Sequence, residues 1–152
     1  MNPNWARWTA ASVVKHFDAL RQNIALYVEG RVRPVTEPGE QFELRLDGPS
    51  AKEFTKGHWQ LDIEINVLIK WMRHPLDAYR GERLKGIVQA AFTNSIRVYN
   101  YGDDDPAELI GCLQLRSDGR EGIITSDFGL IDASQTLRQA TVEGHYRMEL
   151  RT

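Results

Sequence analysis

The histidines are the first residues that could carry chemistry, because imidazole binds transition metals and titrates near neutral pH. His16, His58, His74 and His145 lie far apart in the sequence, without the H-x₃₋₅-H or H-E-x-x-H spacing of zinc sites. This spacing favours surface or turn histidines over metal ligands. His58 and His145 could still meet across a sheet, because both fall in segments with strand-like patterns.

Three consecutive aspartates, Asp103, Asp104 and Asp105, could bind a hard cation, because Ca²⁺ and Mg²⁺ take carboxylate oxygens as ligands. The alternating ligands, central glycine and closing glutamate of an EF-hand loop are missing. Aspartate-rich turns before a proline, here Pro106, are common because their carboxylates bond to nearby backbone. The pattern favours a solvated turn.

The sequence contains no recognisable motif for covalent catalysis. Ser126 and Ser134 are not set in a G-x-S-x-G elbow, and neither glycine-rich phosphate-binding motif occurs. Cys112, the single cysteine, lies in an apolar run, which predicts a small buried hydrophobe in a reducing compartment. We therefore expect no catalytic residue, no metal ligand and no cofactor, and we interpret the chain as non-enzymatic.

Size and charge narrow the class further. A chain of 152 residues with 41% hydrophobic and 26% charged residues is typical of one globular domain, here residues 1–152. Its net charge of −2 argues against general nucleic-acid binding. The N-terminus lacks a signal-peptide pattern, and no apolar stretch approaches the ~20 residues of a membrane span. We expect a soluble protein made in the cytoplasm, without a membrane partner.

The first half of the chain predicts a helix followed by two strands. Apolar residues at steps of three and four indicate a helix over Asn4–Tyr27, with Asn4 as its N-cap, and strand formers in Leu26–Val32 leave its end open. Phe42–Leu46 alternates as a half-buried strand, and Asp47-Gly48-Pro49-Ser50 is expected to form a turn. Leu61–Trp71 shows the strongest period-two alternation and predicts a long strand.

The second half predicts one helix and then several strands. The helix is expected over Leu76–Asn94, and the strands over Ile96–Tyr101, Leu109–Arg116, Ile123–Ile131 and Ala140–Leu150. This order does not alternate as βαβ units would. It predicts an α+β fold with a mainly antiparallel β-sheet and two helices packed on one face.

This succession of elements resembles the tail terminator (tail completion) proteins of long-tailed bacteriophages. The closing run V-E-G-H-Y-R-M-E-L, within Thr141–Leu150, looks like the final strand of such proteins. The resemblance covers nearly the whole chain, by pattern and length. It implies a virion protein that forms a homo-oligomer, a hexameric ring, which caps the tail tube protein and contacts the head-tail connector or stopper protein. It also implies that genomic DNA passes through the lumen without sequence-specific binding.

The expected working surfaces of such a ring are strand edges and loops. The strand Trp59–Trp71 and the C-terminal strand are candidates for edges shared between subunits, since open edges must be covered or blunted. The Asp47–Gly57 connection and the acidic loop are candidates for reaching adjacent proteins. The candidate interface residues are Phe54, Lys56, His58, Trp59, Trp71, Asp103, Asp104 and Asp105.

Other interpretations remain open. Trp59 and Trp71 bracket the long strand, where a subunit interface or a sheet rim would use them, but the pattern favours a core position for each, with an interface next. The chain could be another neck or head-closure subunit of the same class. It could also be a small-ligand-binding α+β domain, which a largely apolar pocket of several hundred Å³ with a few polar anchors would indicate. An enzyme would require clustered titratable residues with shifted pKa values.

Overall fold

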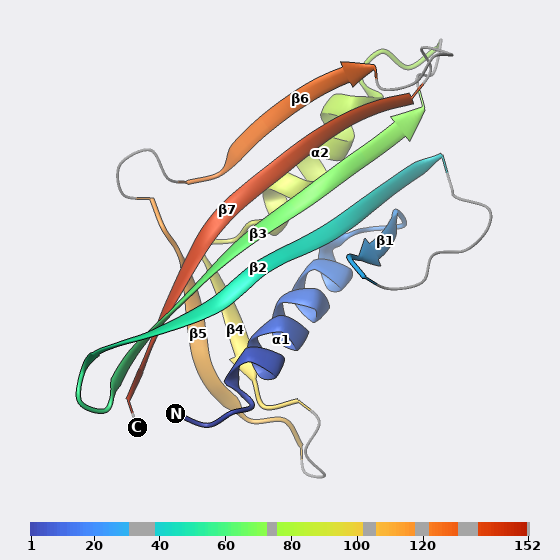
Figure 1. Ribbon diagram of the computed structural model, residues 1–152. Coiled ribbons are helices and arrows are strands. Elements are labelled where there is room, and N and C mark those ends of the chain that lie inside the picture. The colour runs from blue at the N-terminus through green and yellow to red at the C-terminus, as the bar shows by residue number, and fades with distance from the viewer. Residues whose placement is uncertain (31–38, 73–75, 102–105, 118–121, 131–136, 152) are drawn as a thin grey trace.

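The computed structural model describes residues 1–30, 39–72, 76–101, 106–117, 122–130 and 137–151. Two helices and seven strands follow one another in the order α1, β1, β2, β3, α2, β4, β5, β6, β7 (Figure 1). Their bounds are α1 Trp5–Leu20, β1 Ala25–Val28, β2 Glu40–Thr55, β3 His58–Met72, α2 Arg80–Ala91, β4 Ser95–Tyr99, β5 Leu109–Leu115, β6 Ile124–Leu130 and β7 Leu137–Arg151.

The strands form one mixed sheet that curls into a half-barrel (Figure 1). Its strand order is β1-β2-β3-β7-β5-β4, and β6 pairs with β7 beside β5. Only β1 and β2 are parallel among the described pairs, and the other pairs are antiparallel. The centre of the sheet is formed by β3 and β7, which pair without a break from His58 opposite Arg151 to Met72 opposite Leu137. The α+β class is confirmed.

The N-terminal helix is shorter than predicted. It ends at Leu20 instead of Tyr27, because residues 25–28 form β1 and pair with β2, Ala25 opposite Gln41. Gln22 has a positive φ of 55°, in the left-handed region where the chain leaves the helix. The predicted cap is also wrong in its chemistry. Asn4 occupies the N-cap position but makes no side-chain capping bond, and its own N–H donates to Oδ1 of Asn2 at 2.9 Å.

The turn expected at residues 47–50 is absent, because β2 continues through it. The strand carries one extra residue there: Asp47 faces Glu64, and Ser50 faces Asp62. This is a β-bulge. In the sequence a glycine-containing bulge resembles a turn, because both use a glycine with positive φ. Gly48 has a φ of 105°, and a Cβ at this position would lie 2.9 Å from the carbonyl oxygen of Asp62. The chain reverses later, at residues 56–57.

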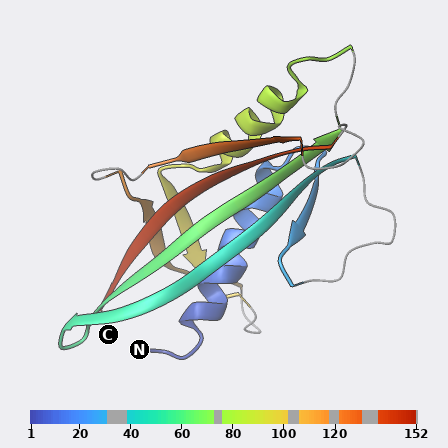
Figure 2. The same cartoon turned by 45° about the horizontal axis from the view of Figure 1, so that its top comes forward.

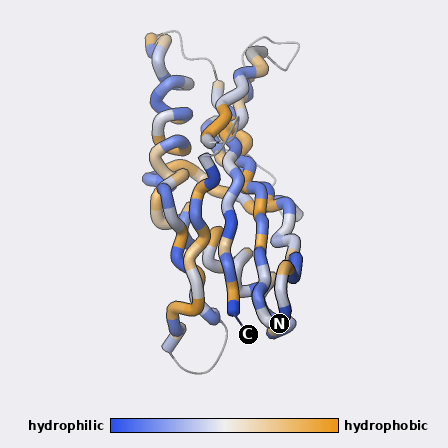
Figure 3. The backbone as a smooth tube through the Cα atoms, turned by 90° about the vertical axis from the view of Figure 1, so that its left-hand side faces the viewer, coloured by the Kyte–Doolittle hydropathy of each residue, from blue (hydrophilic) through white to orange (hydrophobic). Residues whose placement is uncertain are grey.

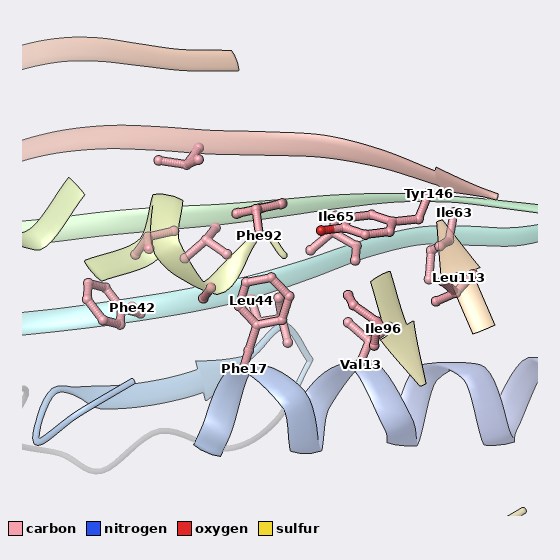
Figure 4. Packing of buried hydrophobic residues seen from close by; sticks show 14 of the residues in the cluster. Val13, Phe17, Phe42, Leu44, Ile63, Ile65, Phe92, Ile96, Leu113 and Tyr146 are labelled. Carbon is pink, nitrogen blue, oxygen red and sulfur yellow. The ribbon is translucent and has the colours of Figure 1, made fainter. Parts of the chain in front are cut away.

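The core lies between α1 and the curled sheet (Figure 4). Alternate residues of β3 and β7 are buried, as the period-two patterns predicted, and the alternation is visible along the strands in Figure 3. The Phe17 ring of α1 packs edge-on against Phe92, with centroids 5.1 Å apart. Tyr146, which is fully buried, donates its hydroxyl to the carbonyl oxygen of Thr93 at 2.7 Å, and burial raises the pKa of Tyr146.

The second helix is held at the opposite end from the β2–β3 turn (Figure 2). It spans Arg80–Ala91, shorter than the predicted Leu76–Asn94, and contacts β3, β7 and α1. Lys85 donates to Glu82 at 2.7 Å and to Asp127 of β6 at 3.2 Å. Burial alone would lower the pKa of Lys85, but these two carboxylates raise it above its usual value. The helix is thereby tied to β6.

Candidate interaction surface

The long strands carry a hairpin arm, residues 50–60, beyond the packed part of the sheet (Figure 1). Every β2 residue from Ser50 to Thr55 is exposed, whereas residues 41–44 of the same strand are buried. The turn of the arm is closed by the N–H of Gly57, which donates to Oε1 of Glu53 at 2.8 Å. The arm therefore presents side chains to solvent on an ordered, paired backbone.

Four of the predicted interface residues lie in this arm. Phe54 is 50% exposed, and its ring meets His58 edge-on with centroids 5.9 Å apart. Lys56 is exposed in the turn, and Trp59 is half-buried against the core. An exposed phenylalanine held by a neighbouring ring is an apolar group placed where a partner can cover it.

The other predicted residues do not join them. Trp71 is 5% exposed and packs in the core against Gly81 of α2, so its side chain has the core role that the sequence favoured and not the interface role. Asp103, Asp104 and Asp105 lie outside the described residues. The sequence could not separate Trp59 from Trp71, because both stand on the same face of one strand.

The prediction that β3 and β7 are shared edge strands is wrong for most of their length. β3 lies between β2 and β7, and β7 lies between β3 on one side and β6 with β5 on the other. Among the described strands, the edges are β1, β4, β6 and the part of β2 beyond the β1 pairing. The last residues of β7 also extend beyond the β5 pairing, which ends at Arg147.

Charged side chains cover the sheet face opposite the core. Arg147 donates to Asp62 at 2.7 Å, and Gln60 donates to the other oxygen of the same carboxylate at 2.7 Å. Burial opposes ionisation of Asp62, but these hydrogen bonds and the Arg147 charge outweigh it and lower the pKa of Asp62. His145 faces Glu64, with 3.9 Å between Nε2 and Oε2. His58 is paired with Arg151 instead, so the two histidines do not meet.

Two of the open grooves lie beside β4 and beside β7. One, of about 430 Å³, runs between α1 and β4, where Nζ of Lys15 lies 3.6 Å from the Tyr101 ring centroid and Nε2 of His16 lies 2.8 Å from the Ala91 oxygen. The other, of about 520 Å³, lies between β5 and the end of β7 and includes Cys112, which is half-buried and not fully buried as expected.

A candidate metal site is not assembled in the described part of the chain. No group of three or more His, Cys, Asp or Glu side chains there could hold a metal ion. Both helices of that part are too short or too polar to cross a bilayer. What the described geometry offers is an exposed arm, strand edges and polar grooves.

Comparisons with known proteins identify the fold without naming a family. No model of a known protein family matches the chain, and no curated protein matches it. One similar solved structure, whose name is only a serial identifier, is 11% identical over 93% of this chain and 94% of that chain, with a TM-score of 0.57. At this identity the likeness shows the fold alone.

Proposed function

We propose that the chain is a ring-forming structural subunit of the tail terminator type, which caps the tail tube of a bacteriophage and joins it to the head connector. The observation that carries this proposal is the ordered hairpin arm, exposed on β2 and bordered by strand edges that no described strand covers. We also infer that both helices cover the concave side of the curled sheet, which leaves strand borders and loops as the working surface.

A closed ring needs two different, complementary faces on each subunit, because rotation about the ring axis sets one face against the other. Open strand edges are such faces, since their unpaired N–H and C=O groups bind another strand. Phe54, half exposed at the tip of the arm, is an apolar contact that a neighbour or the tail tube would cover. The proposed ring lets DNA pass without sequence-specific contacts.

A small-ligand-binding domain is the second candidate, and it has less support. The apolar cavity beneath the helices, lined by Phe17, Leu26, Phe42 and their neighbours, has about 10 Å³ for solvent. A single water needs roughly 10–15 Å³. The larger grooves, of about 400–520 Å³, are open to solvent and mix polar with apolar side chains, unlike the mainly apolar pockets of small-molecule sites.

The test is whether the chain stops the growth of a tail tube. Tube protein encoded in the same genome is polymerised alone and with increasing amounts of this chain, and tube lengths are measured by electron microscopy. A terminator shortens the tubes and is found at one end of each. Tubes of unchanged length without bound chain would refute the tail-terminator assignment. Binding to connector protein but not to tubes would assign the chain to head closure instead.

A further inference from the structure

The first open edge belongs to β2 in the hairpin arm. β1 pairs with β2 only from Gln41 to Leu44, and no other described strand lies beside residues 45–55 on that side. The register with β3 places Ser50 opposite Asp62 and Lys52 opposite Gln60. Alternate residues of this segment therefore direct backbone N–H and C=O groups away from β3, toward solvent.

The second open edge belongs to β7 at the same end of the molecule. β6 pairs with β7 only up to Glu143, and β5 pairs with it only at Tyr146 and Arg147. The C=O of His145 accepts the N–H of Arg116 at 2.8 Å, so His145 directs its backbone groups away from β3. By alternation, Glu149 and Arg151 do the same where no described strand pairs with them.

The hairpin arm and the last residues of β7 therefore form a three-stranded ribbon, β2-β3-β7, with an open edge on each side (Figure 2). The two edges are different strands, which is what a head-to-tail contact requires. β2 and β7 are both antiparallel to β3, so they run in the same direction. A copy rotated about an axis along the strands would add its β2 as a parallel strand beside β7.

Side-chain charges favour this addition. Lys52, Gln60 and Glu149 are partners in one row across the ribbon and share one face. If the neighbouring copy continues this row, its Lys52 stands beside Glu149, so opposite charges meet across the contact. Beside the β7 edge lies the groove of about 520 Å³, lined by Cys112, Gln114, Met148 and Glu149, which leaves space for an incoming strand.

We infer that the subunits of the proposed ring join by adding the β2 edge of one copy to the β7 edge of the next, with Lys52 of one beside Glu149 of the other. This inference rests on the proposed ring and names its interface. The occupant of the edge is a second copy of this chain, because one ribbon carries both complementary edges and both charges.

A charge-swap series tests the interface. Lys52→Glu places like charges across the contact, which repel, and Glu149→Lys does the same from the other side. We expect each single variant to raise the concentration at half-assembly at least about tenfold, and the double variant to restore assembly. Arg83→Glu is the matched control, because Arg83 is exposed on α2, at the opposite end of the molecule from the arm, and makes the same charge change. Circular dichroism checks that all variants are folded.

A disulfide pair provides the second measurement. With Cys112→Ser removing the native thiol, Lys52→Cys and Glu149→Cys are combined in one chain, and mild oxidation is expected to give a ladder of covalently linked multimers on denaturing gels. Neither single cysteine variant should give more than a dimer. The ladder and the restored double variant support the interface.

The outcomes separate the interface from the ring. If the wild-type chain assembles but the single charge reversals assemble equally well and no ladder forms, the edge contact is wrong while the ring stands. If the wild-type chain remains a single chain at every concentration and no ladder forms, both the edge contact and the ring are overturned.

Discussion

Two glycines of α2 provide a matched test of how the helix lies on the sheet. Gly81→Ala and Gly86→Ala make the same chemical change in one helix. A Cβ at Gly81 would lie 2.5 Å from Cζ2 and 2.7 Å from Cε2 of Trp71, whereas a Cβ at Gly86 meets nothing within 4 Å. The structure therefore predicts opposite effects on the free energy of unfolding.

The magnitudes follow from two terms. Alanine is favoured over glycine inside a helix by up to about 1 kcal/mol, which is the whole effect expected for Gly86→Ala. Overpacking against a buried ring typically costs about 1–3 kcal/mol, and Trp71 is 5% exposed with little room to move. Gly81→Ala should therefore be destabilising by roughly 1–2 kcal/mol after the helix-propensity gain.

Thermal unfolding followed by circular dichroism measures both variants. At this chain length, about 1 kcal/mol shifts Tm by roughly 2–4 °C. We expect Gly86→Ala to raise Tm by up to that amount, and Gly81→Ala to lower it by a similar or larger amount. If both alanines raise Tm equally, α2 does not rest on Trp71 as the structure has it.

Three further predictions concern the core, the charged face and the arm. Tyr146→Phe removes the donor to Thr93 and should lower the free energy of unfolding by about 0.5–1.5 kcal/mol, measured by urea unfolding, because a partly buried hydrogen bond is lost. Because the folded-state pKa of Asp62 is below its usual 3.8, its pairing with Arg147 stabilises the fold above about pH 4 and is lost as pH falls through the folded value. The stability difference between wild type and Asp62→Asn should therefore be present at pH 7 and close in acid. Phe54→Ser should leave Tm within about 1 °C, since the side chain is half exposed, yet weaken assembly or tube capping in a sedimentation or electron-microscopy assay.

Each of these has a contrary outcome. An unchanged unfolding free energy for Tyr146→Phe would mean that the Thr93 carbonyl is satisfied in another way. If the stability difference between wild type and Asp62→Asn persists at pH 2, the charge of the carboxylate is not its cause. A fall of several degrees in Tm for Phe54→Ser would place Phe54 in the core and not at an interface.

Local patterns predicted the strands well because alternation is a property of neighbouring residues. Ile63 and Ile65 on β3, and Val142 and Tyr146 on β7, are buried as their spacing required. β1 was missed because four residues directly after a helix give too short a signal, and their strand conformation comes from pairing with distant β2. Pairing with a distant strand also decides the structure at Gly48, where residues typical of a turn form a bulge inside β2.

The candidate surface was predicted in part, and for a physical reason. Exposure at the hairpin tip follows from its position, so Phe54 and Lys56 could be anticipated. Edge status could not, because the order of strands in a sheet depends on which distant segments pair. β3 has the strongest strand pattern in the chain, and its hydrophobicity is typical of a central strand. The open edge is formed instead by exposed β2 residues such as Lys52.

The mass of the purified wild-type protein in solution tests the ring most directly. Light scattering coupled to size-exclusion chromatography, over a range of concentrations, should give one discrete closed species whose mass is six times that of the 17.4 kDa chain. If the mass remains that of a single chain at every concentration, and remains so when tail tubes are added, the proposal that the chain forms a closed ring is contradicted.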